Sequence, residues 1–293
     1  MSLEARREAE RAAAGLPPLL VEARRVAATV QQGVHGRRRS GPGETFWQFR
    51  RYETGDPAAM IDWRRSAKSD RLYVREQEWE ASATVWLWCD ASPSMNFASQ
   101  GLSTTKRHRA NVILLGLADL LLRGGEQVAL LGEGGRRPLR GSVALARLGE
   151  AIARNTSDAD GILSREALPR HAQIVLIGDF LDPPEAIEQV VRGLAGDGAE
   201  GSLVQVLDPA EESLPYAGRV RFQGLEGEGN PLIRRVEAIR PAYHARLAAQ
   251  RNALATICRQ VGWRFLGHRT DHTPETALLA LYLGLSDQAS RRR

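Results

Sequence analysis

Two aspartates and two serines follow apolar runs that have the length of a β-strand. These residues are Asp90, Ser92, Ser94 and Asp179. The first three come directly after the run TVWLWC at 84–89, and the fourth follows QIVLI at 173–177 and one glycine. Ligands of an open parallel sheet bind at the carboxyl ends of its strands, where the strand order reverses. If these two strands are neighbours, the four side chains meet in one crevice. Carboxylates and hydroxyls are hard oxygen ligands that suit Mg²⁺ or Mn²⁺.

Other interpretations of the same residues stay open. Asp90 and the serines are also the residue types that cap a turn and the helix after it. A hydrolase that forms an aspartyl phosphate on Asp90 is a further alternative. Such an enzyme usually has a second acidic residue two positions on, where this chain has Ser92, and it needs a suitable lysine. Lys106 lies just inside the next predicted helix. The chain has no GxxxxGK[ST] phosphate loop and no GxSxG nucleophile elbow.

The elements that must position these residues alternate from residue 83 onward between short apolar runs and amphipathic helices. Strands are predicted at 84–89, 127–131, 173–177, 203–207 and 263–266. Helices are predicted at 103–123, 143–154, from about 185 to 194, 232–261 with a kink or break at Pro241, and 274–283. Strands that are apolar throughout and alternate with helices indicate a parallel sheet covered on both faces. We therefore predict an α/β fold with a doubly wound, mostly parallel sheet and an N-terminal α+β segment.

The first 82 residues have a different pattern. Residues 1–32 are predicted to be helical with a break at Pro17-Pro18, and 33–43 form a glycine-rich loop. Three tryptophans and several arginines crowd residues 44–82, either as packing against the sheet domain or as a docking surface for a partner. The tryptophans are Trp47, Trp63 and Trp79. We predict a division into 1–82, a sheet domain at 83–285, and a basic tail at 286–293.

Composition narrows the class of protein. The 293 residues are 43% hydrophobic and 26% charged, which is typical of a globular protein with a sizeable core. The net charge of +5 is spread along the chain, and only Arg37–Arg39 form a run, so nucleic acid is not an expected partner. A basic nucleic-acid-binding module remains an alternative, through that run and the pairs Arg50–Arg51 and Arg64–Arg65. Two cysteines and the lack of a signal peptide or a bilayer-length apolar stretch lead us to expect a cytoplasmic protein without a membrane span.

Two patterns carry a family resemblance. The D-x-S-x-S motif at Asp90–Ser94, with Asp179 after a later strand, resembles the metal-ion-dependent adhesion site of von Willebrand factor A domains. A longer pattern resembles the bacterial domain-of-unknown-function 58 family and covers about residues 35 to 285. Its parts are Arg51-Tyr52, Gly55-Asp56, Ile61–Trp63, Ser66-Ala67, Asp90–Met95, Ile177–Phe180 and Asp208–Glu212.

The resemblance implies a von Willebrand factor A-like domain that binds other proteins and is not an enzyme. Such proteins are often associated with MoxR-type AAA+ ATPases, as adaptors in the chaperone-like assembly or maturation of other proteins. The two serine hydroxyls would bind Mg²⁺ or Mn²⁺ directly and the two aspartates largely through water, which leaves one position for a partner's carboxylate. A full adhesion site adds a threonine from another loop. Thr156 is the only threonine at 135–165, and its surroundings do not match the usual Gly-Gly-Thr pattern. A metal-dependent phosphohydrolase that uses Asp90 and Asp179 is the alternative.

Overall fold

The structure is a computed structural model, and the chain divides into two compact units. The described residues are 18–35, 48–52, 63–67, 72–76, 84–132, 137–141, 143–154, 168–227 and 229–291. One unit comprises Met1–Gly33 together with Ala83–Arg293, and the other comprises Val34–Ser82. Relative to the expected segment 1–82, the N-terminal helix therefore groups with the sheet domain.

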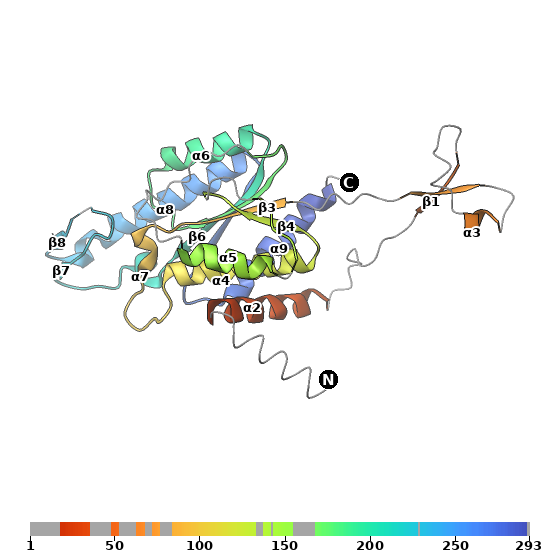
Figure 1. The fold of residues 1–293 in the computed structure, drawn as a ribbon. Helices are drawn as coiled ribbons and strands as arrows, with labels where there is room; N and C mark the ends of the chain where they lie inside the picture. Colours follow the sequence, from red (N-terminus) through yellow and green to blue (C-terminus); the bar gives the residue numbers. More distant parts are fainter. Residues whose placement is uncertain are drawn as a thin grey trace, which may run out of the picture. The chain divides into compact units, whose positions relative to one another are not determined.

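The larger unit is built on one sheet of five parallel strands (Figure 1). In spatial order they are β4 (Gln127–Leu130), β3 (Thr84–Cys89), β5 (Gln173–Gly178), β6 (Glu200–Leu207) and β9 (Arg264–Arg269). Counted along the chain within this sheet, the order is 2-1-3-4-5, so the direction of winding reverses between β3 and β5. The doubly wound parallel sheet is confirmed, and each predicted strand run falls on one of these strands.

Helices cover both faces of the sheet (Figure 1). One face carries α6 (Pro184–Gly196) and α8 (Val236–Gln260), and the other carries α4 (Lys106–Arg123), α5 (Ala144–Arg154) and α9 (Pro274–Arg291). The apolar runs explain this arrangement, because every residue of β5 is buried between the two helical layers. On the first face, Ile174 and Leu203 of the sheet belong to the same apolar core as Leu254 of α8. The described helices include none that is long and apolar enough to cross a membrane.

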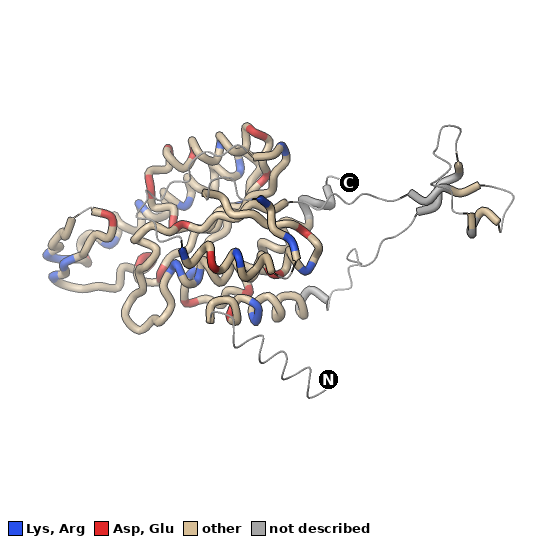
Figure 2. The backbone as a smooth tube through the Cα atoms, in the orientation of Figure 1, with Lys and Arg blue, Asp and Glu red and all other residues tan. Residues whose placement is uncertain are grey.

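The structure corrects the predicted 232–261 helix and the predicted basic tail. Leu232–Ile233 form a strand, β8, which pairs antiparallel with β7 (Val220–Arg221) in a hairpin. Helix α8 begins at Val236 and runs through Pro241 as one element, since the proline removes only one hydrogen bond near the helix start. Helix α9 continues to Arg291, eight residues beyond the predicted end, and takes in most of the expected tail. Figure 2 shows basic residues gathered on the hairpin and on the adjoining start of α8.

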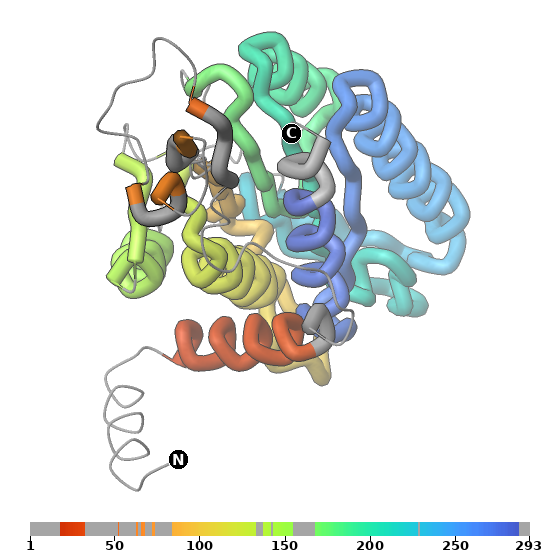
Figure 3. Tube along the Cα trace, turned by 90° about the vertical axis from the view of Figure 1, so that its right-hand side faces the viewer, coloured from red at the N-terminus to blue at the C-terminus, as the bar shows by residue number. Residues whose placement is uncertain are grey.

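Helix α2 (Pro18–His35) packs beside α4 (Figure 3). Its buried residues recur at three- and four-residue spacing and therefore lie on one face. They are Leu20, Ala23, Val26, Ala27 and Val30. A Cβ on Gly149 of α5 would lie 2.9 Å from the side chain of Leu20, so α5 needs a glycine where α2 approaches. The N-terminal helix thus completes the outer layer of the sheet domain.

The smaller unit contains a two-stranded antiparallel sheet and one short helix. Strand β1 (Gln48–Arg51) pairs with β2 (Tyr73–Glu76). The backbone N–H of Tyr73 donates to Ser66 Oγ in α3 (Trp63–Ser66) at 3.0 Å. The side chain of Trp63 is 64% exposed. Trp47 and Trp79 lie outside the described residues.

A candidate cation and docking site

The four predicted site residues meet where the winding of the sheet reverses. Strands β3 and β5 are hydrogen-bonded neighbours, which was the condition for the predicted site, with Cys89 opposite Ile177. The backbone N–H of Asp90 donates to the carbonyl oxygen of Ile177 at 2.8 Å, so the two strands end at the same level. Asp90 and Asp179, the residues that follow these strands, are each 4% exposed. Parallel pairing thus brings together residues that are 89 positions apart in the sequence.

The loop after β3 brings the two serine hydroxyls together and turns that of Ser94 toward Asp179. The backbone N–H of Ser92 donates to Asp90 Oδ1 at 2.8 Å, and this bond closes the turn before the 3₁₀ helix Pro93–Asn96. Ser92 Oγ and Ser94 Oγ lie 3.1 Å apart. The hydroxyl of Ser94 and Asp179 Oδ2 are 2.6 Å apart, a hydrogen bond in which the hydroxyl donates to the carboxylate. The capping interpretation therefore holds for Asp90, and it does not exclude a ligand role for the two hydroxyls.

Lys106 lies at the centre of the site, which the sequence did not indicate. Its side chain is entirely buried at the start of α4. The ammonium donates to Asp179 Oδ2 at 2.8 Å and to Glu211 Oε1 at 2.6 Å. Burial alone would lower the pKa of Lys106, but the two carboxylates outweigh it and raise that pKa, so the group stays charged.

Glu211 reaches Lys106 from α7 (Pro209–Ser213), a short helix directly after β6. The helix begins with a capping box: Asp208 Oδ1 accepts from the N–H of Ala210, and Glu211 Oε2 accepts from the N–H of Asp208. Burial raises the pKa of Glu211, and the ammonium of Lys106 opposes this shift. The third strand end of the sheet thus supplies a carboxylate that the sequence analysis did not include.

The loop after β5 is held by two side-chain amides. Gln205 of β6 donates to the carbonyl oxygen of Asp179 at 2.9 Å. Gln250 of α8 donates to the carbonyl oxygens of Phe180 at 2.8 Å and of Asp182 at 2.7 Å. Phe180 has a φ of 49°, in the left-handed region that side chains rarely adopt, and these bonds keep it there.

Gly178 precedes this loop and allows the two aspartates to approach. A Cβ at this position would lie 3.0 Å from the Cβ of Asp90 and 3.3 Å from its Oδ2. The strand therefore needs a residue without a side chain at the point where it passes Asp90.

A carboxylate from the β7–β8 hairpin reaches the mouth of the site. The backbone N–H of Ser94 donates to Glu226 Oε1 at 3.1 Å, across 132 residues of sequence. Glu226 is exposed and lies in the turn between β7 and β8. It therefore adds a negative charge beside Asp90 and Asp179.

Negative charge exceeds positive charge within the site. Asp179 and Glu211 share the ammonium of Lys106, and the charge of Asp179 also acts on Asp90. Burial raises the pKa of Asp90 to about 6, and the charges of Asp179 and Glu226 add to the shift. Ionisation of Asp90 therefore costs more here than in water, and a cation bound nearby would lower that cost.

The hydroxyl pair fits a small divalent cation. Each Mg–O bond is about 2.1 Å long, so adjacent ligands of an octahedral Mg²⁺ lie about 3 Å apart. The 3.1 Å between Ser92 Oγ and Ser94 Oγ matches that spacing. Because the Ser94 proton points to Asp179, the Ser92 hydroxyl donates to Ser94 Oγ, and one lone pair of that oxygen stays available for a cation. Within the described residues, no group of three His, Cys, Asp or Glu could hold a metal without the hydroxyls.

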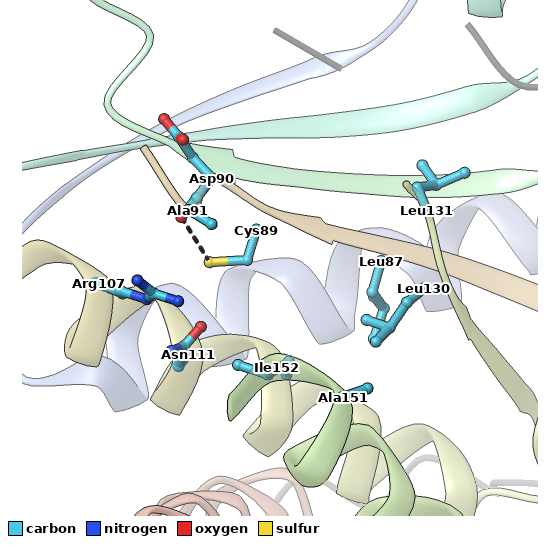
Figure 4. A pocket seen from close by; sticks show the side chains of 10 residues that line it. All are labelled: Leu87, Cys89, Asp90, Ala91, Arg107, Asn111, Leu130, Leu131, Ala151 and Ile152. Atoms are coloured by element: carbon cyan, nitrogen blue, oxygen red, sulfur yellow. Dashed lines mark hydrogen bonds between the residues drawn. The ribbon is translucent and has the colours of Figure 1, made fainter. Parts of the chain in front are cut away.

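A small cavity lies beside β3, and Asp90 is among the residues that line it. It has a volume of about 20 Å³, room for one water molecule, and lies between β3, β4, α4 and α5 (Figure 4). Cys89, Arg107 and Asn111 line it, whereas the carboxylate of Asp90 points away from them (Figure 4). Burial raises the pKa of Cys89 above that of an ordinary thiol, which keeps the sulfur protonated and unreactive.

Two sequence expectations about binding residues fall outside the described part of the chain. Thr156, the candidate for the additional metal ligand, lies in 155–167. The arginine run Arg37–Arg39, on which the nucleic-acid alternative partly rested, is also outside it.

Comparison with known proteins identifies the family. The family described as "Protein of unknown function DUF58" matches residues 48–253, more than two thirds of the chain. The chain belongs to the DUF58 family. The predicted family is thereby confirmed, and its match includes the four predicted site residues together with Lys106, Glu211 and Glu226.

The DUF58 chain also has curated relatives and similar solved structures. Uncharacterized protein Rv1480 of Mycobacterium tuberculosis and Uncharacterized protein Mb1516 of Mycobacterium bovis are each 27% identical to it over 248 residues, 79% of this chain and 76% of theirs. The crystal structure of the conserved hypothetical protein BatB from Bacteroides thetaiotaomicron matches with a TM-score of 0.42 and 14% identity, covering 71% of this chain and 100% of that one. An aerotolerance-related membrane protein from Bacteroides fragilis matches with a TM-score of 0.41 and 13% identity, over 68% and 96% of the two chains.

Proposed function

We propose that this DUF58 protein is a non-enzymatic interaction module that docks an acidic group of a partner through a divalent cation. The cation would be Mg²⁺ or Mn²⁺, bound directly by the hydroxyls of Ser92 and Ser94, with Asp90 and Asp179 balancing its charge. The observation that carries the proposal is the hydroxyl pair, 3.1 Å apart, whose Ser94 member gives its proton to Asp179. A cation held in this way keeps coordination positions open toward solvent, where a carboxylate of a partner can bind.

The charges of the site support a cation and a binding role. A divalent ion beside Asp90 would offset the excess of carboxylates over the one ammonium. Asp179, the aspartate best placed to react, already accepts hydrogen bonds from Lys106 and Ser94 on one oxygen. These hydrogen bonds favour a structural role for the carboxylate of Asp179 over a role as a nucleophile.

The surface beside the site favours an acidic partner. Seven arginines and three glutamates lie between residues 214 and 251, although the whole chain has an excess of only five positive charges. The arginines include Arg219, Arg221, Arg234 and Arg235 on or next to the hairpin (Figure 2). Such a surface increases the rate of encounter with acidic proteins. By the resemblance to von Willebrand factor A domains, we propose a MoxR-type AAA+ ATPase as the partner and an adaptor role in the assembly or maturation of other proteins.

Binding measurements with purified proteins test this function. Thermal unfolding would be followed with and without Mg²⁺, and binding to a MoxR-type ATPase from the same genome would be measured in Mg²⁺ and in EDTA. Wild type, Asp90→Ala and the exposed-charge control Glu150→Gln would be compared. We expect Mg²⁺ to stabilise wild type and the control but not Asp90→Ala, and we expect ATPase binding to follow the same pattern. Binding that is equal in EDTA and in Asp90→Ala would refute docking through the cation.

Lys106 supports one alternative, a metal-dependent phosphohydrolase. An ammonium 2.8 Å from Asp179 could stabilise a phosphoryl group at this site, and Lys106 is the lysine that the sequence placed just inside the next helix. Hydrolysis of p-nitrophenyl phosphate in Mg²⁺ that disappears in both Asp179→Asn and Lys106→Met would favour the enzyme. Activity that is equal in these variants and wild type would come from a contaminant.

A further inference from the structure

The turn between β7 and β8 places one of the protein's own carboxylates where the proposed function puts that of a partner. Glu226 Oε1 lies 3.1 Å from the backbone nitrogen of Ser94. The hydroxyl of Ser94 is one of the two proposed cation ligands. The carboxylate is therefore within one side-chain rotation of a cation bound to Ser92 and Ser94.

The hairpin that carries Glu226 is small. It has two paired positions in strands, Val220 with Ile233 and Arg221 with Leu232. Two further backbone hydrogen bonds extend it, from Phe222 N to the carbonyl of Pro231 and from Gly224 N to the carbonyl of Gly229. The hairpin is separate from the five-stranded sheet, so its turn can move without breaking the pairing of that sheet.

We propose that Glu226 is an intramolecular ligand of the cation, which occupies the partner's coordination position until an acidic partner displaces it. This inference rests on the proposed function, because it requires a cation at Ser92 and Ser94. The β7–β8 hairpin would then block the coordination position at which the partner's carboxylate binds. It also supplies a fifth side chain to a site for which the sequence offered only four.

Manganese binding tests the inference on the full-length protein. Free Mn²⁺ would be measured by electron paramagnetic resonance, and water bound to the protein's Mn²⁺ by proton relaxation. The proteins would be wild type, Glu226→Gln, the exposed-charge control Glu150→Gln, and Asp90→Asn. Glutamine keeps the size and a hydrogen-bond acceptor for Ser94 while it removes the charge.

We expect Glu226→Gln to bind Mn²⁺ about tenfold more weakly than wild type and to gain exchangeable water on the ion. Acetate should then displace that water at a lower concentration in Glu226→Gln than in wild type, because its competitor is gone. Glu150→Gln should behave like wild type. Equal affinity and equal hydration in Glu226→Gln and wild type, with Mn²⁺ binding lost only in Asp90→Asn, would overturn the inference and leave the cation site standing. If wild type binds no Mn²⁺, the cation of the proposed function fails, and the inference fails with it.

Discussion

Replacing Asp90 with asparagine removes one charge from the site at almost constant volume. Asp90 is 4% exposed, and burial together with the charge of Asp179 raises its pKa from 3.8 to about 6. An asparagine can keep the acceptor oxygen that the N–H of Ser92 uses. The substitution therefore isolates the cost of an ionised carboxylate in this position.

The sign of the effect follows from the direction of the pKa shift. Because the pKa is higher in the folded protein, protonated Asp90 contributes stability that is full below about pH 4 and lost as the pH rises through about 6. A shift of about two pH units corresponds to roughly 3 kcal/mol. In EDTA at pH 7.5 we expect Asp90→Asn to raise the free energy of unfolding by about 2–3 kcal/mol, or the melting temperature by about 5 °C. At pH 5.0 the gain should be about half as large.

Urea unfolding at pH 5.0 and pH 7.5 measures this difference. The exposed residue Glu150 offers a control, since Glu150→Gln should differ from wild type by the same small amount at both pH values. Addition of Mg²⁺ at pH 7.5 should stabilise wild type and leave Asp90→Asn unchanged. The reasoning is refuted if the advantage of Asp90→Asn over wild type does not grow between pH 5.0 and pH 7.5.

Three further variants or reactions test the contacts around the site. Lys106→Met should lower the free energy of unfolding by about 3–5 kcal/mol, because two buried carboxylates lose their counter-ion. Adding Glu211→Gln should restore part of that stability. Purely additive losses in urea unfolding would argue against the ion pair. Gly178→Ala should cost about 1–3 kcal/mol because its Cβ would crowd an aspartate, whereas Gly196→Ala, which meets nothing within 4 Å, should change stability by less than about 1 kcal/mol. Cys89 should resist iodoacetamide at pH 8 in the native protein, as judged by mass spectrometry, because its raised pKa keeps the thiol protonated. Rapid alkylation would show that the thiolate forms at this pH.

The sheet and the two aspartates could be predicted because both depend on local patterns. Runs such as TVWLWC and QIVLI are apolar on both faces, which only a strand covered by helices on each side tolerates. Neighbouring parallel strands end at the same edge, so Asp90 and Asp179 had to converge once β3 and β5 were adjacent. The adjacency itself was an assumption, since a sequence pattern does not give the strand order.

Lys106 was missed because its environment is tertiary. A lysine in the first turn of a helix is ordinarily solvated, and nothing near it in sequence indicates that Glu211, 105 positions away, covers it. One signal was present. The chain has 40 basic residues, of which two are lysines, so a lysine marks a place where arginine does not serve. A compact ammonium fits between two carboxylates that a planar guanidinium would push apart.

The β7–β8 hairpin was missed for a different reason. The residues after Pro231 have an apolar spacing that also fits the start of the long helix, and the sequence analysis assigned them to it. Strands of two residues are too short to show an alternating pattern. Glu226 was missed for the same reason, because its contact with Ser94 depends on the conformation of the turn between β7 and β8.

The two halves of α8 have different surroundings. Its C-terminal half packs on the sheet through Leu254 and Ile257, while most residues of its N-terminal half are exposed. At 1.5 Å per residue, its 25 residues make a rod of roughly 37 Å. Gln250, just past the middle, holds the loop after β5, and Tyr243 donates to the carbonyl oxygen of Glu211 at 2.6 Å.

Helix α8 is therefore attached to the site near its middle, through Tyr243 and Gln250. A protein that pushes or pulls on its exposed end cannot tilt the helix without straining the amide bonds that fix the loop after β5 and the hydroxyl bond that fixes Glu211. A displacement of α8 would therefore be transmitted to Phe180, the residue after Asp179, and to Glu211, the partner of Lys106.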